Sequence, residues 1–204
     1  MRSTSRLVAV IVAVVVALLA QVTVLPEIAP LLTWHGVGPG PVLLVVVATA
    51  LVTDPRFATL TGFFAGLLLD LAPPADHLAG RWALALLVVG YVVSRLAHDH
   101  QPVAPGPLEL ERAAHGRPPW TLVLAAAAGG SFVGNSVFAL SGVLLGDHAG
   151  GLTDLLRVVG IALPWDVAAA LVVVPLTTWL FARLAAPQPG LRLTPRAPWR
   201  TPTA

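Results

Sequence analysis

Long apolar runs, broken by short polar or charged stretches, are the dominant pattern along this chain. Six segments stand out, at residues 7–25, 41–53, 57–71, 82–97, 120–146 and 161–186. An α-helix rises about 1.5 Å per residue and needs roughly 20 residues to cross the hydrocarbon of a bilayer. The pattern therefore predicts one all-α membrane domain, residues 1–186, built as a bundle of six transmembrane helices.

The second and third segments are short for a full crossing. The charged step Asp54-Pro55-Arg56 separates them, and its proline lacks a backbone N–H. Because charges flank the proline, we favour two short or tilted spans that turn at the membrane surface. A single re-entrant hairpin over residues 41–71 is the alternative, and the sequence leaves it open.

The first segment follows a basic stub, RSTSR, as the apolar core of a signal peptide would. We expect a permanent helix instead, because the apolar run is long and no A-x-A cleavage site follows it. Gln21 and Thr23 also stand where cleavage would be expected.

Composition supports the membrane assignment. Apolar residues make up 56% of the chain and charged residues 11%, and the mean hydropathy is +0.83. There is no cysteine, which excludes disulfides and thiol chemistry. The net charge is only +2, so the high isoelectric point does not indicate a nucleic-acid partner.

The arginines predict an orientation. With the N-terminus in the cytoplasm of a six-span protein, only Arg81 and Arg157 fall outside, and the other ten of the twelve fall inside. We therefore expect a multi-pass protein of the bacterial inner membrane with both termini cytoplasmic. The proline-rich stretch 98–119 is predicted to be a flexible cytoplasmic loop, and residues 187–204 a disordered basic tail.

A carboxylate ends the third apolar run, GFFAGLLLDL. Gly62, Gly66 and Asp70 are four residues apart, which places them in one stripe of a helix and predicts close approach of another helix. Asp70 has two favoured interpretations: a solvated residue at a helix end, or a structural partner for Arg81 or the next loop. Proton or ion transport is the less favoured third. Gly80 is expected to start the next span.

The fifth segment has a similar spacing. Gly130 and Gly134 predict another small packing face, and Asn135 is expected to make an interhelical hydrogen bond rather than to bind a ligand. Gln21 leaves the same choice between a structural role, here at the membrane interface, and a ligand role.

Two further patterns bear on the helix boundaries and on chemistry. Leu163-Pro164-Trp165-Asp166 predicts a helix start, with proline in the first turn and a carboxylate at the positive end of the dipole. The chain has no nucleophile elbow, P-loop, HExxH or dinucleotide motif. The run His98-Asp99-His100 lies in a loop without preorganised support, so we expect no enzyme activity, metal or cofactor.

Several of these patterns occur in one order: Gln21-Val22-Thr23, the unit GFFAGLLLDL, a loop to Gly80, then GYVVSRL at 90–96, and LPWD at 163–166. Together they resemble the MreD family of rod shape-determining membrane proteins of bacteria. The resemblance covers most of residues 1–186 and is most specific over 62–95. The 98–119 loop and the basic tail depart from the family pattern.

The resemblance implies a non-enzymatic scaffold subunit of the cell-wall elongation machinery, or elongasome. Such proteins work with the bitopic protein MreC and with the peptidoglycan synthase pair of a SEDS glycosyltransferase and a penicillin-binding transpeptidase. They work indirectly with the MreB filament. On this basis Gly62, Gly66 and Asp70 match the family motif and shape either the bundle or a partner-binding face.

The same arrangement is similar to the substrate-binding component of energy-coupling-factor vitamin transporters, which is the alternative. Such a component needs polar and aromatic groups gathered in an outer pocket. The outer loops offer Trp34, His35, Asp76, His77, Asp147, His148 and Asp154.

Overall fold

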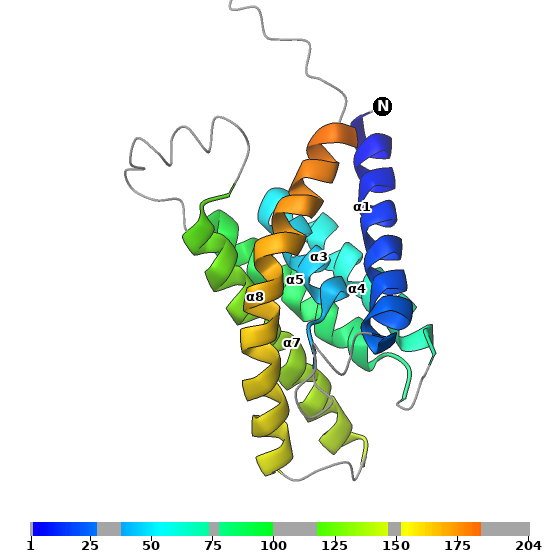
Figure 1. Cartoon of the computed structure of the whole chain (residues 1–204), viewed down its shortest axis with the longest axis vertical. Coiled ribbons are helices and arrows are strands. Elements are labelled where there is room, and N and C mark those ends of the chain that lie inside the picture. Colours follow the sequence, from blue (N-terminus) through cyan, green and yellow to red (C-terminus); the bar gives the residue numbers. More distant parts are fainter. Residues whose placement is uncertain (1, 28–37, 74–77, 100–117, 147–151, 185–204) are drawn as a thin grey trace, which may run out of the picture.

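The computed structural model describes residues 2–27, 38–73, 78–99, 118–146 and 152–184. Within these ranges the chain forms helices and no strand. The helices are α1 (Arg2–Leu19), the π-helical turn η1 (Ala20–Val24), α3 (Pro41–Val52), α4 (Pro55–Leu71), α5 (Arg81–Asp99), α7 (Trp120–Leu144) and α8 (Leu152–Leu184) (Figure 1). The tail at 187–204, predicted to be disordered, and residues 100–117 of the predicted loop lie outside these ranges.

Four helical stretches are long and apolar enough to cross a membrane: Thr4–Glu27, Arg81–Asp99, Trp120–Leu144 and Leu156–Phe181. The chain is accordingly a multi-pass membrane protein. The remaining two helices are shorter, with 12 residues in α3 and 17 in α4. At about 1.5 Å per residue, α3 is roughly 18 Å long, well short of a hydrocarbon layer of about 30 Å.

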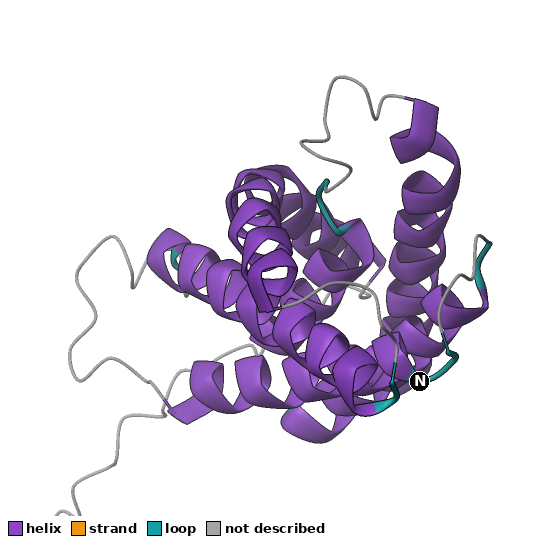
Figure 2. Ribbon diagram, turned by 90° about the horizontal axis from the view of Figure 1, so that it is seen from below, coloured by secondary structure: helices purple, strands orange, loops and turns teal. Residues whose placement is uncertain are grey.

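The short helix α3 forms the centre of the bundle. Nine consecutive residues of α3, from Val42 to Ala50, are buried, so every side of the helix is covered by protein. The helices α1, α4, α5, α7 and α8 all pack against it. Figure 2 shows the helices of the bundle seen from below. A helix that is apolar all round, as α3 is, belongs in such a position.

A two-residue hinge joins α3 to α4, where the sequence predicts a turn. Asp54 is the N-cap of α4, and its side chain accepts a hydrogen bond from the backbone N–H of Phe57 at 3.2 Å. The hydroxyl of Ser94 donates to the carbonyl of Thr53 at 3.1 Å, which fastens the hinge to α5.

The helices α4 and α5 pack with their backbones in contact. A Cβ added at Gly62 would collide with the backbone carbonyl of Leu86, and one added at Gly66 with that of Trp82. From the other helix, a Cβ at Gly90 would collide with the carbonyl of Ala58. Glycine is thus required on both sides of this contact, since no larger residue leaves room for the opposing backbone.

The glycines of α7 face the side chains of the core instead. A Cβ at Gly130 would lie 2.7 Å from a methyl of Val47, and one at Gly134 would lie 2.9 Å from a methyl of Leu43. Both neighbours belong to α3. The two predicted small-residue faces are therefore internal surfaces of the same bundle.

The start of α8 differs from the prediction. We expected a helix start at the LPWD step, but α8 begins at Leu152 and runs through Pro164 and Pro175. Proline resembles a first-turn residue in sequence, yet membrane helices tolerate it internally when neighbouring groups satisfy the freed carbonyl. The correction places Asp166 inside the bundle.

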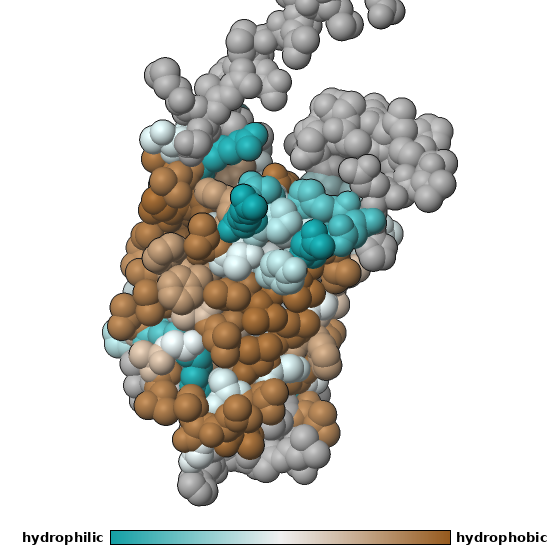
Figure 3. Space-filling model, turned by 180° about the vertical axis from the view of Figure 1, so that it is seen from behind, coloured by the Kyte–Doolittle hydropathy of each residue, from teal (hydrophilic) through white to brown (hydrophobic). Residues whose placement is uncertain are grey.

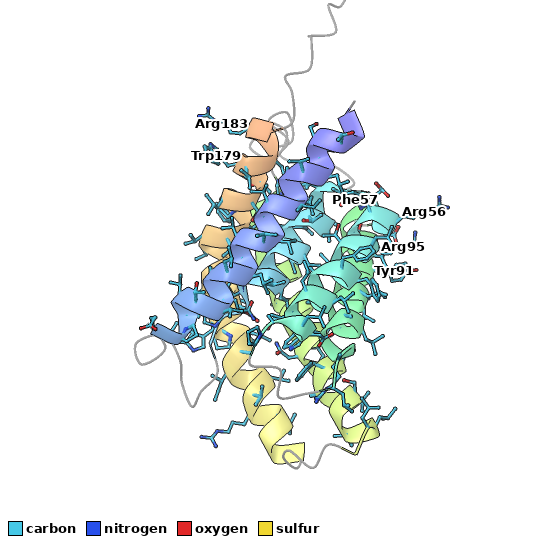
Figure 4. All side chains as sticks on the ribbon, turned by 90° about the vertical axis from the view of Figure 1, so that its right-hand side faces the viewer. Arg56, Phe57, Tyr91, Arg95, Trp179 and Arg183 are labelled. Carbon is cyan, nitrogen blue, oxygen red and sulfur yellow. The ribbon has the colours of Figure 1, made fainter. Side chains whose placement is uncertain are left out.

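Arginines and aromatic side chains mark one end of the molecule. The labelled Arg56, Arg95 and Arg183 lie toward the end where α1 begins and α8 finishes (Figure 4). Aromatic neighbours accompany them, and the Arg183 guanidinium lies 5.2 Å from the ring centre of Trp179. Apolar residues cover much of the face shown in Figure 3, and hydrophilic ones gather mainly toward this end. Arginine and aromatic residues at one level are typical of a membrane interface.

Candidate functional site

The carboxylate of Asp70 binds the start of α5. The side chain is 1% exposed and accepts three backbone hydrogen bonds, from Gly80 at 2.8 Å, Trp82 at 3.0 Å and Ala83 at 3.0 Å. The first N–H groups of a helix have no partner within it, and the helix dipole favours an anion there. Of the interpretations open from the sequence, this geometry matches the structural link to the next loop, and Asp70 is not solvated.

Gly80 gives this link its shape. Its φ angle is +99°, a left-handed backbone conformation that residues other than glycine rarely adopt. Its N–H points at Asp70, and its carbonyl accepts from Leu84 at 2.9 Å as the first hydrogen bond of α5. Gly80, which was predicted to start the span, therefore does so. Its turn directs the backbone N–H toward the carboxylate of Asp70.

Arg81 extends the contact to α7. Its guanidinium donates to the carbonyl of Phe138 at 3.0 Å and lies 4.1 Å from the centre of the same residue's ring. The ring of Trp82 stacks on Phe138 at 4.3 Å between centres. A Cβ at Gly142 would collide with the guanidinium, so the small residue makes room for the buried charge. The start of α5 and the C-terminal part of α7 are joined in this way.

A second buried carboxylate, Asp166, binds the start of α3. Asp166 is 2% exposed and accepts from the N–H of Gly40 at 2.7 Å and from the hydroxyl of Ser131 at 2.6 Å. The N–H of Val42 donates to the side-chain oxygen of Gln21 at 3.3 Å. Groups from three other helical segments thus meet at the N-terminus of α3.

A cavity of about 250 Å³ lies at this point, and we call it the α3 cavity. Its lining combines four residues whose side chains carry a polar group, three residues of the chain leading into α3, and four residues with apolar side chains. These are Gln21, Trp82, Asn135 and Asp166; Gly38, Pro39 and Gly40; and Leu43, Leu69, Val158 and Ala162.

Asn135 lies in the lining but does not bridge helices as predicted. Its side-chain nitrogen donates to the carbonyl of Ser131 at 2.9 Å and to the hydroxyl of Ser131 at 3.3 Å, both within α7. The interhelical hydrogen bond is made by Ser131 to Asp166. The reason is geometric, because a residue four positions back along a helix lies within reach of an asparagine side chain.

The roles of Ser131, Asp166, Gly40 and Phe138 were not predicted from the sequence. One signal was available for Asp166: a lone carboxylate within an apolar run of membrane-spanning length is a functional or structural site by default. Its assignment to a helix start hid that signal. The outer-loop residues noted for the alternative function lie outside the residues whose side chains the structure describes.

The site offers oxygen acceptors, amides and an indole. Among the described residues, no three His, Cys, Asp or Glu side chains gather in a metal-binding group. Comparison with known proteins adds no relative: no protein-family model matches the chain, and no curated protein or solved structure matches it significantly.

Proposed function

We propose that this chain is a non-enzymatic scaffold subunit of the bacterial cell-wall elongation machinery, of the MreD type. It would cross the inner membrane six times, with α3 and α4 as short spans, and keep both termini in the cytoplasm. Arg56, Arg95 and Arg183 lie toward the end of the molecule where α1 begins and α8 finishes, which supports this orientation.

The observation that carries the proposal is the use made of buried polar groups. Seven polar or charged residues are buried in the described part of the chain. Thr49 and Thr177 donate to carbonyls of their own helices, whereas the other five bond to a different segment of the chain, and both buried carboxylates bind helix starts. Buried hydrogen bonds between helices hold a bundle in one shape, which is what a scaffold requires.

The residues behind the family resemblance support it in a second way. In the described parts of this segment, residues 62–73 and 78–95, the glycines of α4 approach the backbone of α5, and Asp70 binds N–H groups at the start of α5. The motif therefore specifies a fold. Because Gly62 and Gly66 are covered by α5, we place partner recognition on outward faces instead of on this stripe.

The helix α1 offers such a face. Seven of its large apolar side chains are exposed, while Ala9, Ala13 and Ala17 face inward. The exposed set is Leu7, Val8, Ile11, Val12, Val15, Val16 and Leu19. Lipid or the single helix of an MreC-like bitopic protein would cover it equally well, because neither requires a polar group.

Site-directed crosslinking tests the proposal directly, because the chain contains no cysteine. Single cysteines at Ile11 and Val16 would carry a photoreactive crosslinker in native membranes, with Ala13 as the inward-facing control. Mass spectrometry should recover an MreC-like protein or the peptidoglycan synthases from the outward positions and much less from Ala13. Absence of all wall-synthesis proteins, in both crosslinking and a mild-detergent pull-down of the tagged chain, would contradict the proposal.

The α3 cavity favours a second candidate, the substrate-binding subunit of an energy-coupling-factor vitamin transporter. A short helix that starts beside a polar cavity in the bundle is a common way to hold a substrate in a membrane. The same pull-down separates the candidates, since an ATPase module and its coupling subunit would replace the wall synthases.

A further inference from the structure

The α3 cavity is a feature that a scaffold function leaves unused. We propose that it binds a small organic cation of about eight to twelve non-hydrogen atoms, with the charged group at Asp166 and an apolar ring or chain beside Trp82. This inference does not rest on the scaffold function, and it is tested on the isolated chain.

The negative charge of the lining favours a ligand with a positive charge. Asp166 is the one charged side chain among the described lining residues, and it lies at the polar wall with Gln21 and Asn135. Each of its oxygens accepts one hydrogen bond, from Gly40 and from Ser131. A carboxylate has about four acceptor positions, so acceptor capacity remains for a donor that enters the cavity.

The side-chain amide of Asn135 adds to the same preference. Asn135 uses its nitrogen on Ser131, which leaves its oxygen as an acceptor at the cavity wall. An ammonium group carries three donors and no acceptor. It therefore matches a wall that presents the carboxylate of Asp166 and the amide oxygen of Asn135.

Volume and the apolar wall set the size of the ligand. At about 30 Å³ for each water-sized group, 250 Å³ has room for roughly eight of them. Leu43, Leu69, Val158 and Ala162 supply no hydrogen bonds, and Trp82 adds an aromatic surface beside them. Such a wall suits a single ring or a short chain better than ordered water.

Helix capping by Asp166 explains the carboxylate but does not explain the space beside it. Non-helical backbone inside a membrane bundle is tolerated where it is buried or lines a cavity, and Gly38, Pro39 and Gly40 line this one. The open volume and the irregular approach to α3 are thus parts of one arrangement.

Benzylamine is the probe for this site, with benzyl alcohol and benzoate as neutral and anionic analogues of almost the same size. Ligand-observed NMR on the full chain in lipid nanodiscs, corrected with empty nanodiscs, would measure saturable binding. We expect a benzylamine Kd in the millimolar range and at least tenfold weaker binding of both analogues.

Two variants localise the binding. Ala162→Leu fills the cavity from α8, whereas Gly160→Leu adds a side chain two positions away, where a Cβ meets nothing within 4 Å. Ala162→Leu should weaken benzylamine binding at least tenfold, and Gly160→Leu should leave it unchanged. Asp166→Asn should lower the benzylamine affinity to that of benzyl alcohol.

The inference is overturned if benzyl alcohol or benzoate binds as well as benzylamine. Undiminished benzylamine binding in the Ala162→Leu protein would overturn it too, because the filled cavity leaves no room for the ring. If Asp166→Asn fails to fold, the comparison of Ala162→Leu with Gly160→Leu and the three-ligand comparison on the unaltered chain still decide. Either of these two comparisons can overturn the ligand inference while the crosslinking to wall synthases still supports the scaffold function, so the two failures are distinguishable.

Discussion

Asp166, near the middle of α8, accepts a 2.7 Å hydrogen bond from the backbone N–H of Gly40, where α3 begins. The residues are 126 positions apart in the chain. Asp70 and Trp82 repeat the relationship over a shorter separation, at 3.0 Å. In both cases a buried carboxylate from one helix binds the N–H groups that begin another, which fixes the position and the direction of the second helix.

Removing Asp166 should destabilise the core. Asp166→Ala leaves the N–H of Gly40 and the hydroxyl of Ser131 without their acceptor, and we expect a loss of about 2 kcal/mol in the free energy of unfolding. Unfolding in mixed detergent micelles would measure it. Ser131→Ala, which keeps the Gly40 hydrogen bond, should cost only about 1 kcal/mol. Equal stability of Asp166→Ala and the unaltered protein would refute this view of the contact.

Asp70 offers a comparison between a buried and an exposed cap. Asp70→Ala removes the acceptor of three N–H groups and should cost about 3 kcal/mol, because these groups are shielded from water. Asp54→Ala removes the exposed cap of α4 and should cost about 1 kcal/mol. The same detergent titration measures both, and a larger loss for Asp54→Ala would show that burial does not set the effect.

Gly66→Ala should disrupt the bundle more than its single methyl suggests. The added carbon would collide with the backbone of Trp82, so α4 and α5 must separate, at a cost of about 3 kcal/mol or more. Gly129→Ala is the matched control on α7, where a Cβ meets nothing within 4 Å. It should stabilise the helix by up to about 1 kcal/mol. Thermal melting of the two purified variants should therefore shift in opposite directions.

Arg81 is predicted to require its planar guanidinium. Arg81→Lys keeps the charge but loses the ring contact with Phe138 and the fork of donors, so we expect a loss of about 1 to 2 kcal/mol. Arg157→Lys, at an exposed position of α8, should be neutral within about 0.5 kcal/mol. Melting temperatures at equal detergent concentration would show whether the two substitutions differ.

The helix positions follow from the sequence because each apolar run corresponds to one helix. The glycine spacing likewise indicated close packing, but periodicity along one helix does not say which neighbour covers it, so Gly66 was open to a partner. The start of α8 was missed because Pro164 has the same local signature at a helix start and inside a membrane helix. Asp166 was missed for a related reason, since its partner Gly40 is remote in sequence.

The long separation of Gly40 and Asp166 also bears on how the chain is made. The N-terminal half of the core leaves the ribosome well before α8 does, since 126 residues separate the donor from its acceptor. The N–H of Gly40, at the residue that caps α3, is therefore made before its acceptor, and a nascent chain that stops before residue 166 has no acceptor from α8 for it. Translocon retention or chaperone protection of α3 should therefore last until α8 has been inserted.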